Sequence, residues 1–171
     1  MKEWSRFETD IQKINSMYLR RGIGVVEKIP NGNKTIRKNG MAQMVRDGQT
    51  GCDFIGHLRG VPVAFDCKST KNKTRFPLGD KRVVLFKPHQ LDFLKAFDDS
   101  GGFGFLLMKM SQQADIFLVP INDFLSMRED LHARDKKSIP IAMLEKYRVA
   151  LYGIYVDYEK KISELIGERD G

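Results

Sequence analysis

The sequence has few cysteines and no long apolar run. Its 171 residues include only two cysteines, Cys52 and Cys67, which are too few for a disulfide framework. No uncharged apolar stretch approaches the about 20 residues that a membrane-spanning helix needs. The opening residues, MKEWSRFETD, lack the apolar core of a secretion signal. We therefore expect a soluble cytoplasmic protein without a membrane partner.

Acidic residues are scarce in two windows of the chain. Residues 20–46 carry seven Lys and Arg against the single acid Glu27, and residues 67–87 carry seven against the single acid Asp80. The formal net charge of the whole chain is only +7, so the excess is local. Solvated loops are one explanation, but they do not usually segregate charge in this way. A phosphate-rich polyanion such as nucleic acid is the better candidate partner.

Helical spacing appears at the start of the chain and again near its middle. Five large apolar or aromatic residues recur every three or four positions in residues 3–21: Trp4, Phe7, Ile11, Ile14 and Tyr18. Gly22 then interrupts the pattern, and Pro88 is placed to open a second helix. A short helix is also expected over residues 121–127. These helices would flank a sheet.

Strand-like runs lie between and after the predicted helices. They cover residues 23–30, 52–58, 61–68, 103–110 and 115–120. Residues 31–51 have four glycines, a basic bias and no sustained period, so we expect a basic protrusion at about residues 30–49. A second basic loop is expected from Ser69 to about Lys87. The pattern favours a single α/β domain over residues 1–171, with a mixed central sheet.

A tight turn determines how two of these strands face each other. Arg59 and Gly60 separate the runs CDFIGHL and VPVAFDC, and together they have the length of a two-residue hairpin loop. Counting outward from this loop puts His57 in a non-hydrogen-bonded pair, which suits its proline partner. The same count places Asp53 directly opposite Asp66, also in a non-hydrogen-bonded pair. We therefore expect two carboxylates side by side.

The facing carboxylates of Asp53 and Asp66 suggest a metal site. Opposed acids repel, and a fold tolerates them when a cation lies between them or when one is protonated. Alternation puts Lys68 on the face of Asp66, whereas Phe65 and Cys67 point to the core. Oxygen ligands beside an ammonium group suit Mg²⁺ or Mn²⁺. The chemistry that fits is metal-assisted phosphodiester hydrolysis, in which Lys68 orients the attacking water or offsets developing charge.

Two other interpretations of this region are weaker. An acid, any residue and a lysine also occur by chance at the polar end of a buried strand. A zinc site built from Cys52, Cys67 and His57 is poorly supported, because His57 would point to the opposite face and no further ligand has suitable spacing. Buried, reduced cysteines are the better expectation.

Several segments resemble the RecU family of Holliday junction resolvases, in a bacterial or phage-encoded form. The specific segments are CDFIGHLRGVPVAFDCKSTKNKTRFPL, HQLDFLKAF and GGFGFLLM, within residues 50–107. The opening FETDIQKINSMYLRRGIGVVEKIP also resembles that family's first helix and strand. The resemblance covers most of the chain. It implies the restriction-endonuclease-like PD-(D/E)XK fold, a mixed central sheet flanked by helices.

The resemblance implies roles for individual residues. Asp53 matches the first acid of the family motif, Asp66 the second and Lys68 the lysine. Gln90 matches a glutamine on the following helix, which contacts water or metal in family members. The implied metal ligands are the carboxylates of Asp53 and Asp66 and the backbone carbonyl of Cys67.

Some positions on the first helix and in the motif match the family less specifically. Glu8 is a further candidate ligand, because such a glutamate reaches the metal in some relatives, but a solvated helix face explains it equally well. Asn15 matches another polar position. The family usually has glutamate where this chain has Asp66, and the protrusion at residues 30–49 differs from the family's stalk.

Basic side chains near the site and in the protrusion are candidates for phosphate binding. They are Lys71, Lys73 and Arg75 in the loop after the active-site strand, and Arg37, Lys38 and Arg46 in the protrusion. Each could instead be solvated surface charge. Paired cuts in opposite strands require two sites related by symmetry, so a homodimer is expected. Residues 147–158 could form its interface or pack within the monomer, and a recombinase is a further candidate partner.

The leading expectation is a structure-specific, divalent-metal-dependent DNA endonuclease. It would resolve four-way junctions in recombination and repair by paired symmetric nicks. A related nuclease that nicks, repairs or restricts duplex DNA is the first alternative, and residues 30–49 are the feature that separates the two. A non-catalytic DNA-binding recombination factor is the second alternative. The intact set of Asp53, Asp66 and Lys68 argues against it.

Overall fold

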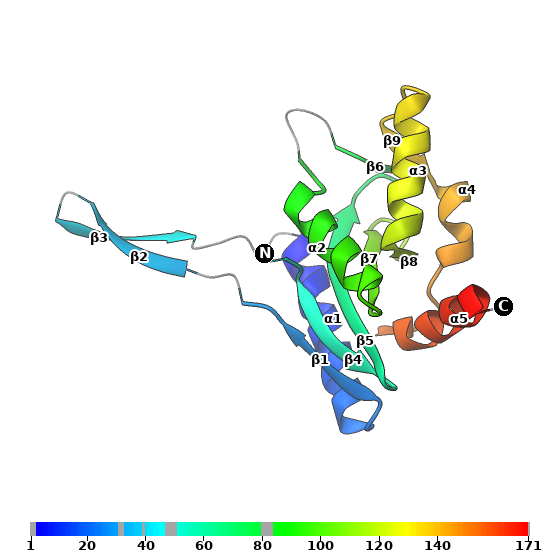
Figure 1. The fold of residues 1–171 in the computed structure, drawn as a ribbon, viewed down its shortest axis with the longest axis horizontal. Helices are drawn as coiled ribbons and strands as arrows, with labels where there is room; N and C mark the ends of the chain where they lie inside the picture. Colours follow the sequence, from blue (N-terminus) through cyan, green and yellow to red (C-terminus); the bar gives the residue numbers. More distant parts are fainter. Residues whose placement is uncertain (1–2, 31–32, 39, 47–50, 80–83, 171) are drawn as a thin grey trace.

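A five-stranded mixed sheet lies at the centre of the molecule (Figure 1). The computed structural model describes residues 3–30, 33–38, 40–46, 51–79 and 84–170. In spatial order the central strands are β1 (Gly24–Lys28), β4 (Phe54–Leu58), β5 (Val61–Thr70), β7 (Phe103–Met110) and β8 (Asp115–Pro120). All neighbours are antiparallel except β5 and β7, which are parallel and connected through a helix. The predicted mixed sheet is confirmed.

Helices and three smaller ladders surround this sheet. The helices are α1 (Glu3–Arg20), α2 (Pro88–Asp99), α3 (Ile121–Ala133), α4 (Ile141–Leu144), the 3₁₀ turn η1 (Glu145–Tyr147) and α5 (Tyr158–Asp170). The two-stranded ladders are β2 (Asn33–Lys38) with β3 (Met41–Arg46), β6 (Arg75–Pro77) with β9 (Ser138–Pro140), and β10 (Leu151–Tyr152) with β11 (Tyr155–Val156). None of the helices, over the residues described, is long and apolar enough to cross a membrane.

α1 forms because its apolar residues fall on one stripe. Phe7, Ile11, Ile14 and Tyr18 are at most 3% exposed, so the whole stripe is buried. The helix ends just before Gly22, which has a φ of 67°. The predicted helix over residues 3–21 is therefore confirmed to within one residue, although the side chain of Trp4 lies outside the described part of the chain.

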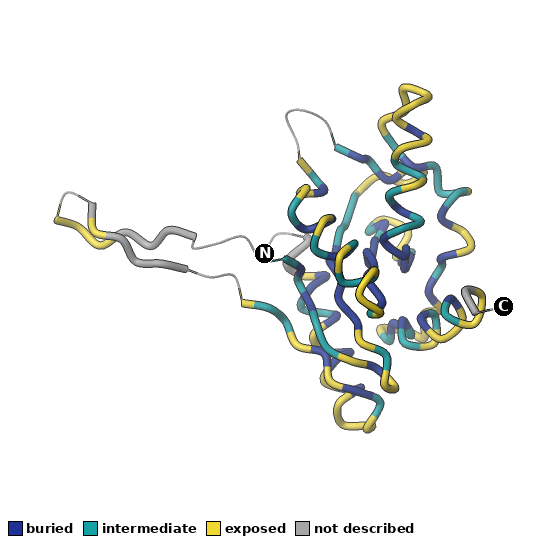
Figure 2. The backbone as a smooth tube through the Cα atoms, viewed as in Figure 1, coloured by how far each residue is buried: buried dark blue, intermediate teal, exposed yellow. Residues whose placement is uncertain are grey.

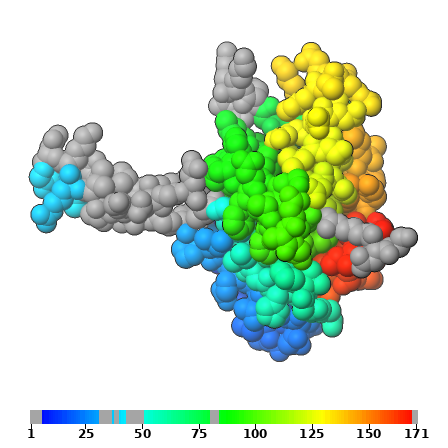
Figure 3. Space-filling model, in the orientation of Figure 1, coloured from blue at the N-terminus to red at the C-terminus, as the bar shows by residue number. Residues whose placement is uncertain are grey.

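Different helices cover the two faces of the sheet. On one face the ring of Phe65 stacks on Phe105, with centroids 4.6 Å apart, and lies 5.5 Å from the ring of Tyr158 in α5. On the same face the Nζ atom of Lys109 in β7 lies 5.2 Å from the ring of Phe7 in α1. α2 and α3 lie side by side on the opposite face, where Figure 3 shows them in green and yellow.

A glycine lets α2 approach this second face closely. A Cβ atom at Gly104 would lie 2.4 Å from the carbonyl oxygen of Leu94 in α2, which is closer than real Cβ contacts allow. The residue beside Gly104 in the β5–β7 ladder is the small Ala64. The Gly104 N–H also donates to Asp98 in the last turn of α2 at 3.1 Å. α2 is thereby fixed against the sheet, with its first turn beside Lys68.

The segment predicted as a basic protrusion is a β-hairpin that projects from the body of the molecule (Figure 1). β2 and β3 pair in register from Asn33 and Arg46 to Lys38 and Met41. Gly40 in the connecting loop has a φ of 76°. The predicted protrusion is therefore present, but its strands, which form a regular ladder, were not predicted. The dipeptide Asn-Gly at residues 39–40 is the sequence signal for such a loop.

Two further boundaries differ from the prediction. The basic loop expected from Ser69 to Lys87 contains β6, because Phe76 pairs with Ile139 in β9 and both side chains are fully buried. The helix expected over residues 121–127 continues as α3 for six more residues, since Leu131 also packs into the core. Figure 2 shows that much of the outer part of α3 is exposed, whereas the middle of β5 is buried.

Candidate active site

The β4–β5 hairpin has the register that its two-residue loop predicts, with Phe54 opposite Phe65. The loop residues Arg59 and Gly60 have φ angles of 46° and 80°. A type I′ turn requires positive φ at both of these positions. Regular pairing begins at Phe54, so Asp53 lies just beyond the end of the ladder.

Beyond this point the regular register ends, and the two carboxylates add to a remaining backbone contact, in which the Asp53 N–H donates to the Phe65 carbonyl at 3.2 Å. The Asp53 N–H donates to Asp66 Oδ1 at 2.8 Å, and the Cys67 N–H donates to Asp53 Oδ2 at 2.9 Å. Each acid is therefore held by the backbone of the other strand, and the predicted proximity of Asp53 and Asp66 is confirmed. The Asp53 carbonyl accepts from the Ile29 N–H at 2.8 Å, which ties the pair to the end of β1.

Asp66 is fully buried, at 0% exposure. Its Oδ2 atom lies 3.1 Å from Lys68 Nζ but has no well-aligned hydrogen bond within the described residues. Burial raises the pKa of Asp66 to about 6, with Lys68 opposing the shift and Asp53 adding to it. A buried carboxylate oxygen without a full set of partners fits a divalent cation, which favours such hard oxygen ligands.

The proton on Asp66 should make the metal-free protein sensitive to pH. The folded state binds this proton more tightly than the unfolded chain, so the associated stability is present at low pH and is lost as pH rises from about 4 to about 6. We expect a loss on the order of 3 kcal/mol. Thermal unfolding in chelator across this range would measure it. Asp66→Asn should lack this component, and identical pH profiles for the two proteins would contradict the assignment.

Lys68 and Gln90 complete the cluster from two different elements. The Lys68 Nζ donates to Gln90 Oε1 at 3.1 Å, and the Lys68 side chain is only 12% exposed. Gln90 lies in the first turn of α2 and is 6% exposed. The structure therefore brings together all four residues that the sequence predicts as catalytic: Asp53, Asp66, Lys68 and Gln90.

Glu8, another candidate ligand, is buried at 6% exposure and forms an ion pair with a lysine. Its Oε2 atom lies 2.6 Å from the Nζ of Lys28, at the end of β1. Among the described residues no three His, Cys, Asp or Glu side chains lie together in a way that could hold a metal ion. Lys28 was not predicted, because the contact joins a helix to a strand and leaves no periodic signal in the sequence.

The side chains of the weaker zinc alternative and of Asn15 do not join this cluster. Cys52 and Cys67 are buried and free, as expected, and His57 is exposed, so the zinc alternative gains no support. Asn15 is 4% exposed and accepts a hydrogen bond from the Tyr158 hydroxyl at 2.5 Å. Asn15 thus links α1 to α5.

The segment after β5 presents its predicted basic residues at the surface. Lys71, Lys73 and Arg75 are all exposed, although Arg75 is the first residue of β6 and not part of the loop. Asn72, which the sequence did not single out, shapes this loop by accepting from the N–H groups of Thr74 and Arg75 at 3.1 and 3.2 Å. The side chain therefore holds a turn between the basic residues.

The basic residues predicted in the protrusion are only partly described. Arg37 is exposed on the β2–β3 hairpin. The side chains of Lys38 and Arg46 lie outside the described residues, although their backbones belong to β2 and β3.

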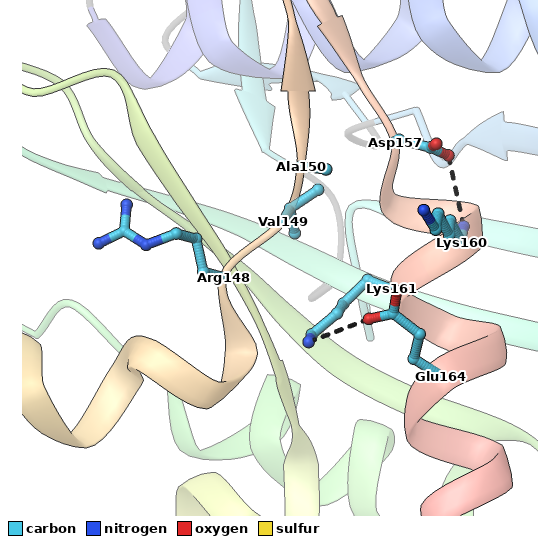
Figure 4. Close-up of a pocket in the computed structure, with 7 residues that line it drawn as sticks. All are labelled: Arg148, Val149, Ala150, Asp157, Lys160, Lys161 and Glu164. Carbon is cyan, nitrogen blue, oxygen red and sulfur yellow. Dashed lines mark hydrogen bonds and ion pairs between the residues drawn. The ribbon is translucent and has the colours of Figure 1, made fainter.

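A cavity elsewhere in the molecule lacks the partly unsatisfied buried carboxylate found at Asp66. About 260 Å³ of space lies between α5 and the segment that precedes β10 (Figure 4). Figure 4 shows Lys161 and Glu164 pointing toward each other, at 3.2 Å, while Arg148 points away. Arg148 is paired with Asp115 and Glu145. Because these charged groups are paired within the protein, the cavity is a weaker candidate than the cluster around Asp66.

Comparison with known proteins gives a consistent family match. The family model described as RecU, Recombination protein U, matches residues 3–164. The chain is similar to the Holliday junction resolvase RecU of Pediococcus pentosaceus, with 28% identity over 152 residues, 85% of this chain and 73% of that protein. It is 30% identical to that of Shouchella clausii over 146 residues, 81% of this chain and 67% of that protein. It is 25% identical to that of Levilactobacillus brevis over 175 residues, 96% of this chain and 85% of that protein.

Proposed function

The chain belongs to the RecU family, and from that premise we propose that it is an endonuclease that resolves Holliday junctions. The observation that carries this conclusion is the single cluster of Asp53, Asp66, Lys68 and Gln90, whose members are joined by hydrogen bonds and an ion pair. Its two carboxylates and its lysine match the chemistry of metal-assisted phosphodiester hydrolysis. The proposed nuclease domain spans residues 1–171.

Mg²⁺ or Mn²⁺ is the proposed metal. The carboxylates of Asp53 and Asp66 and the backbone carbonyl of Cys67 would hold it, and the partly unsatisfied Asp66 Oδ2 supports this choice. When bound, such an ion polarises the scissile phosphoryl group and lowers the pKa of a coordinated water. Asp53 and Asp66 are already oriented by backbone N–H groups, so little reorganisation is needed when they bind the ion.

Lys68 is the proposed partner of the attacking water or of the charged transition state. Its Nζ atom lies between Asp66 and Gln90, at 3.1 Å from an oxygen of each, so the ammonium group has a defined position. Gln90 holds it there from α2. A fixed donor beside the scissile phosphate stabilises the charge that develops during hydrolysis.

Branched DNA is the proposed substrate, and the projecting β2–β3 hairpin with exposed Arg37 supports it. Paired nicks need two sites, so we propose a two-fold homodimer that acts in the cytoplasm, with a recombinase as a further partner. In the predicted interface segment, residues 147–158, Tyr147 and Tyr158 are buried but Tyr152 and Ile154 are 60% and 94% exposed. These exposed side chains are candidates for the dimer contact.

The loop after β5 gives a prediction about salt dependence. Replacing both Lys73 and Arg75 with alanine should make the slope of log affinity against log salt less steep by about 2, since each lost phosphate contact removes about one released counterion. Junction-binding titrations at several salt concentrations measure this slope. Lys160→Ala, an exposed residue of α5, serves as the control and should leave the slope unchanged. An unchanged slope in the double variant would remove this loop from the DNA-binding surface.

A direct test of the function compares substrates and metals. The protein is incubated with a mobile four-way junction or a matched linear duplex, in Mg²⁺, Mn²⁺ or chelator. Symmetric nicks on the junction, with metal and not with chelator, are expected. Equal cutting of the duplex would indicate a duplex nuclease. Junction binding without cleavage in either metal would indicate a non-catalytic DNA-binding protein.

A further inference from the structure

Glu8 and Lys28 form an ion pair beside the proposed active site. The Lys28 Nζ lies 2.6 Å from Glu8 Oε2, and the side chains of Lys28 and Glu8 are 29% and 8% exposed. Such a pair cannot be treated as solvated surface charge, because one of its members is almost completely removed from water. Losing either partner would leave the other charge poorly compensated.

The pair lies next to both strands that carry the catalytic acids. Lys28 pairs with Phe54 across the β1–β4 ladder, and the next residue, Ile29, donates its N–H to the Asp53 carbonyl. Glu8 lies in α1, which packs against β5, and its ion pair with Lys28 places its carboxylate at the end of β1 that Ile29 joins to Asp53. Glu8 is therefore close enough to affect the electrostatic field of the site.

Glu8 approaches β5 from the face opposite to Lys68. α1 packs on the face of the sheet that carries Phe65 and Lys109. Alternation along β5 puts Asp66 and Lys68 on the other face, where Lys68 meets α2. In the described part of the chain, Glu8 also does not complete a group of three potential metal-binding side chains. Its carboxylate affects the site without being arranged as a third ligand.

The net charge of the side chains around Asp66 and Glu8 favours binding of one divalent ion. Asp66 has Lys68 within 3.1 Å and Glu8 has Lys28 within 2.6 Å, whereas Asp53 is bound by the Cys67 N–H. Three carboxylates and two ammonium groups leave one net negative charge. A single divalent cation reverses it and leaves the site attractive to a phosphodiester. A second cation would put two more positive charges into a largely buried region, at a high desolvation cost.

We propose that Lys28 is a positioning residue that holds Glu8 as its own counter-ion, so that the site binds one divalent cation at Asp53 and Asp66. Glu8 is then not a metal ligand, in contrast to what the family resemblance implies. This inference rests on the proposed function, which supplies the ion. It assigns to Lys28 the place that a second cation would otherwise take beside Glu8.

Calcium titrations of the full chain by calorimetry, without DNA, test the proposal. The wild type should bind one Ca²⁺ per chain, and Glu8→Gln should still bind one, about tenfold more weakly, because Lys28 is left without its counter-ion. Lys28→Met frees the Glu8 carboxylate, so it should bind a second ion or bind the first at least about tenfold more tightly. The double variant Glu8→Gln with Lys28→Met removes both charges and should return to the wild-type result. A purely structural role for Lys28 would not produce this gain and its reversal.

The outcomes separate this inference from the proposed function. A double variant that binds the ion as weakly as Glu8→Gln, two ions in the wild type, or wild-type behaviour of a folded Lys28→Met variant would each overturn the inference alone. If Lys28→Met fails to fold, as judged by circular dichroism, the comparison of the wild type with the double variant, which leaves neither charge unpaired, still decides. Asp66→Asn should lose the ion. Failure of the wild type to bind any ion would contradict the proposed metal site as well.

Discussion

Asp66→Asn is expected to lower the rate of junction cleavage by at least about 10³-fold while leaving junction binding within about threefold. The amide oxygen can still accept the Asp53 N–H bond that Asp66 Oδ1 now accepts at 2.8 Å, so the local fold should persist. It cannot supply the negative charge that a divalent cation requires. Single-turnover cleavage of a labelled four-way junction, with a parallel binding titration, measures both quantities.

Two matched variants sharpen the result for Asp66. Asp99→Asn removes a carboxylate from an exposed pair with Lys95 at the end of α2 and should cut at the wild-type rate. Asp66→Glu keeps the charge but adds a methylene in a fully buried position, so an intermediate rate is expected. If Asp66→Asn cut within tenfold of the wild type, Asp66 would not be a metal ligand.

Lys68→Met should lower the cleavage rate by about 10²- to 10³-fold with little effect on junction affinity. The ammonium group is held between Asp66 and Gln90 at 3.1 Å from each, and methionine retains much of its volume without the charge. Lys68 also opposes the upward shift in the pKa of Asp66. Its loss should therefore move the acid limb of the pH–rate profile to higher pH, because Asp66 must be deprotonated to bind the ion.

The pH profile distinguishes a catalytic lysine from a structural one. Lys95→Met removes an exposed lysine from α2 and should leave both the rate and the profile unchanged. A slow Lys68→Met enzyme with an unshifted acid limb would indicate that Lys68 does not control the ionisation of Asp66. A wild-type rate would exclude Lys68 from the chemistry.

The two acids proposed as catalytic could be found from sequence because their geometry is local. A two-residue loop at Arg59 and Gly60 determines the hairpin register, and that register brings Asp53 to Asp66. The same reasoning applies to the protrusion, where the dipeptide Asn-Gly at residues 39–40 signals a hairpin that the glycine-rich composition obscured. Short-range turn chemistry was thus the most informative signal in this sequence.

Features that depend on distant segments could not be derived in this way. The full burial of Asp66 results from packing of β5 against β7 and α2, which no period in the sequence encodes. The ion pair of Glu8 and Lys28 and the β6–β9 ladder join elements far apart in the chain. The family resemblance supplied Gln90, and the structure then showed its contact with Lys68. Neither the periodicity nor the composition of the sequence predicts that contact.

The metal site itself is the central claim, and crystals soaked in Mn²⁺ test it most directly. Anomalous scattering from manganese locates the ion independently of any assumption about its ligands. The account predicts one peak per chain, about 2.0–2.5 Å from oxygens of both Asp53 and Asp66, and no second peak at Glu8. A peak bound by Glu8 and not by Asp66, or an empty site between the two aspartates in a fully soaked crystal, would contradict it.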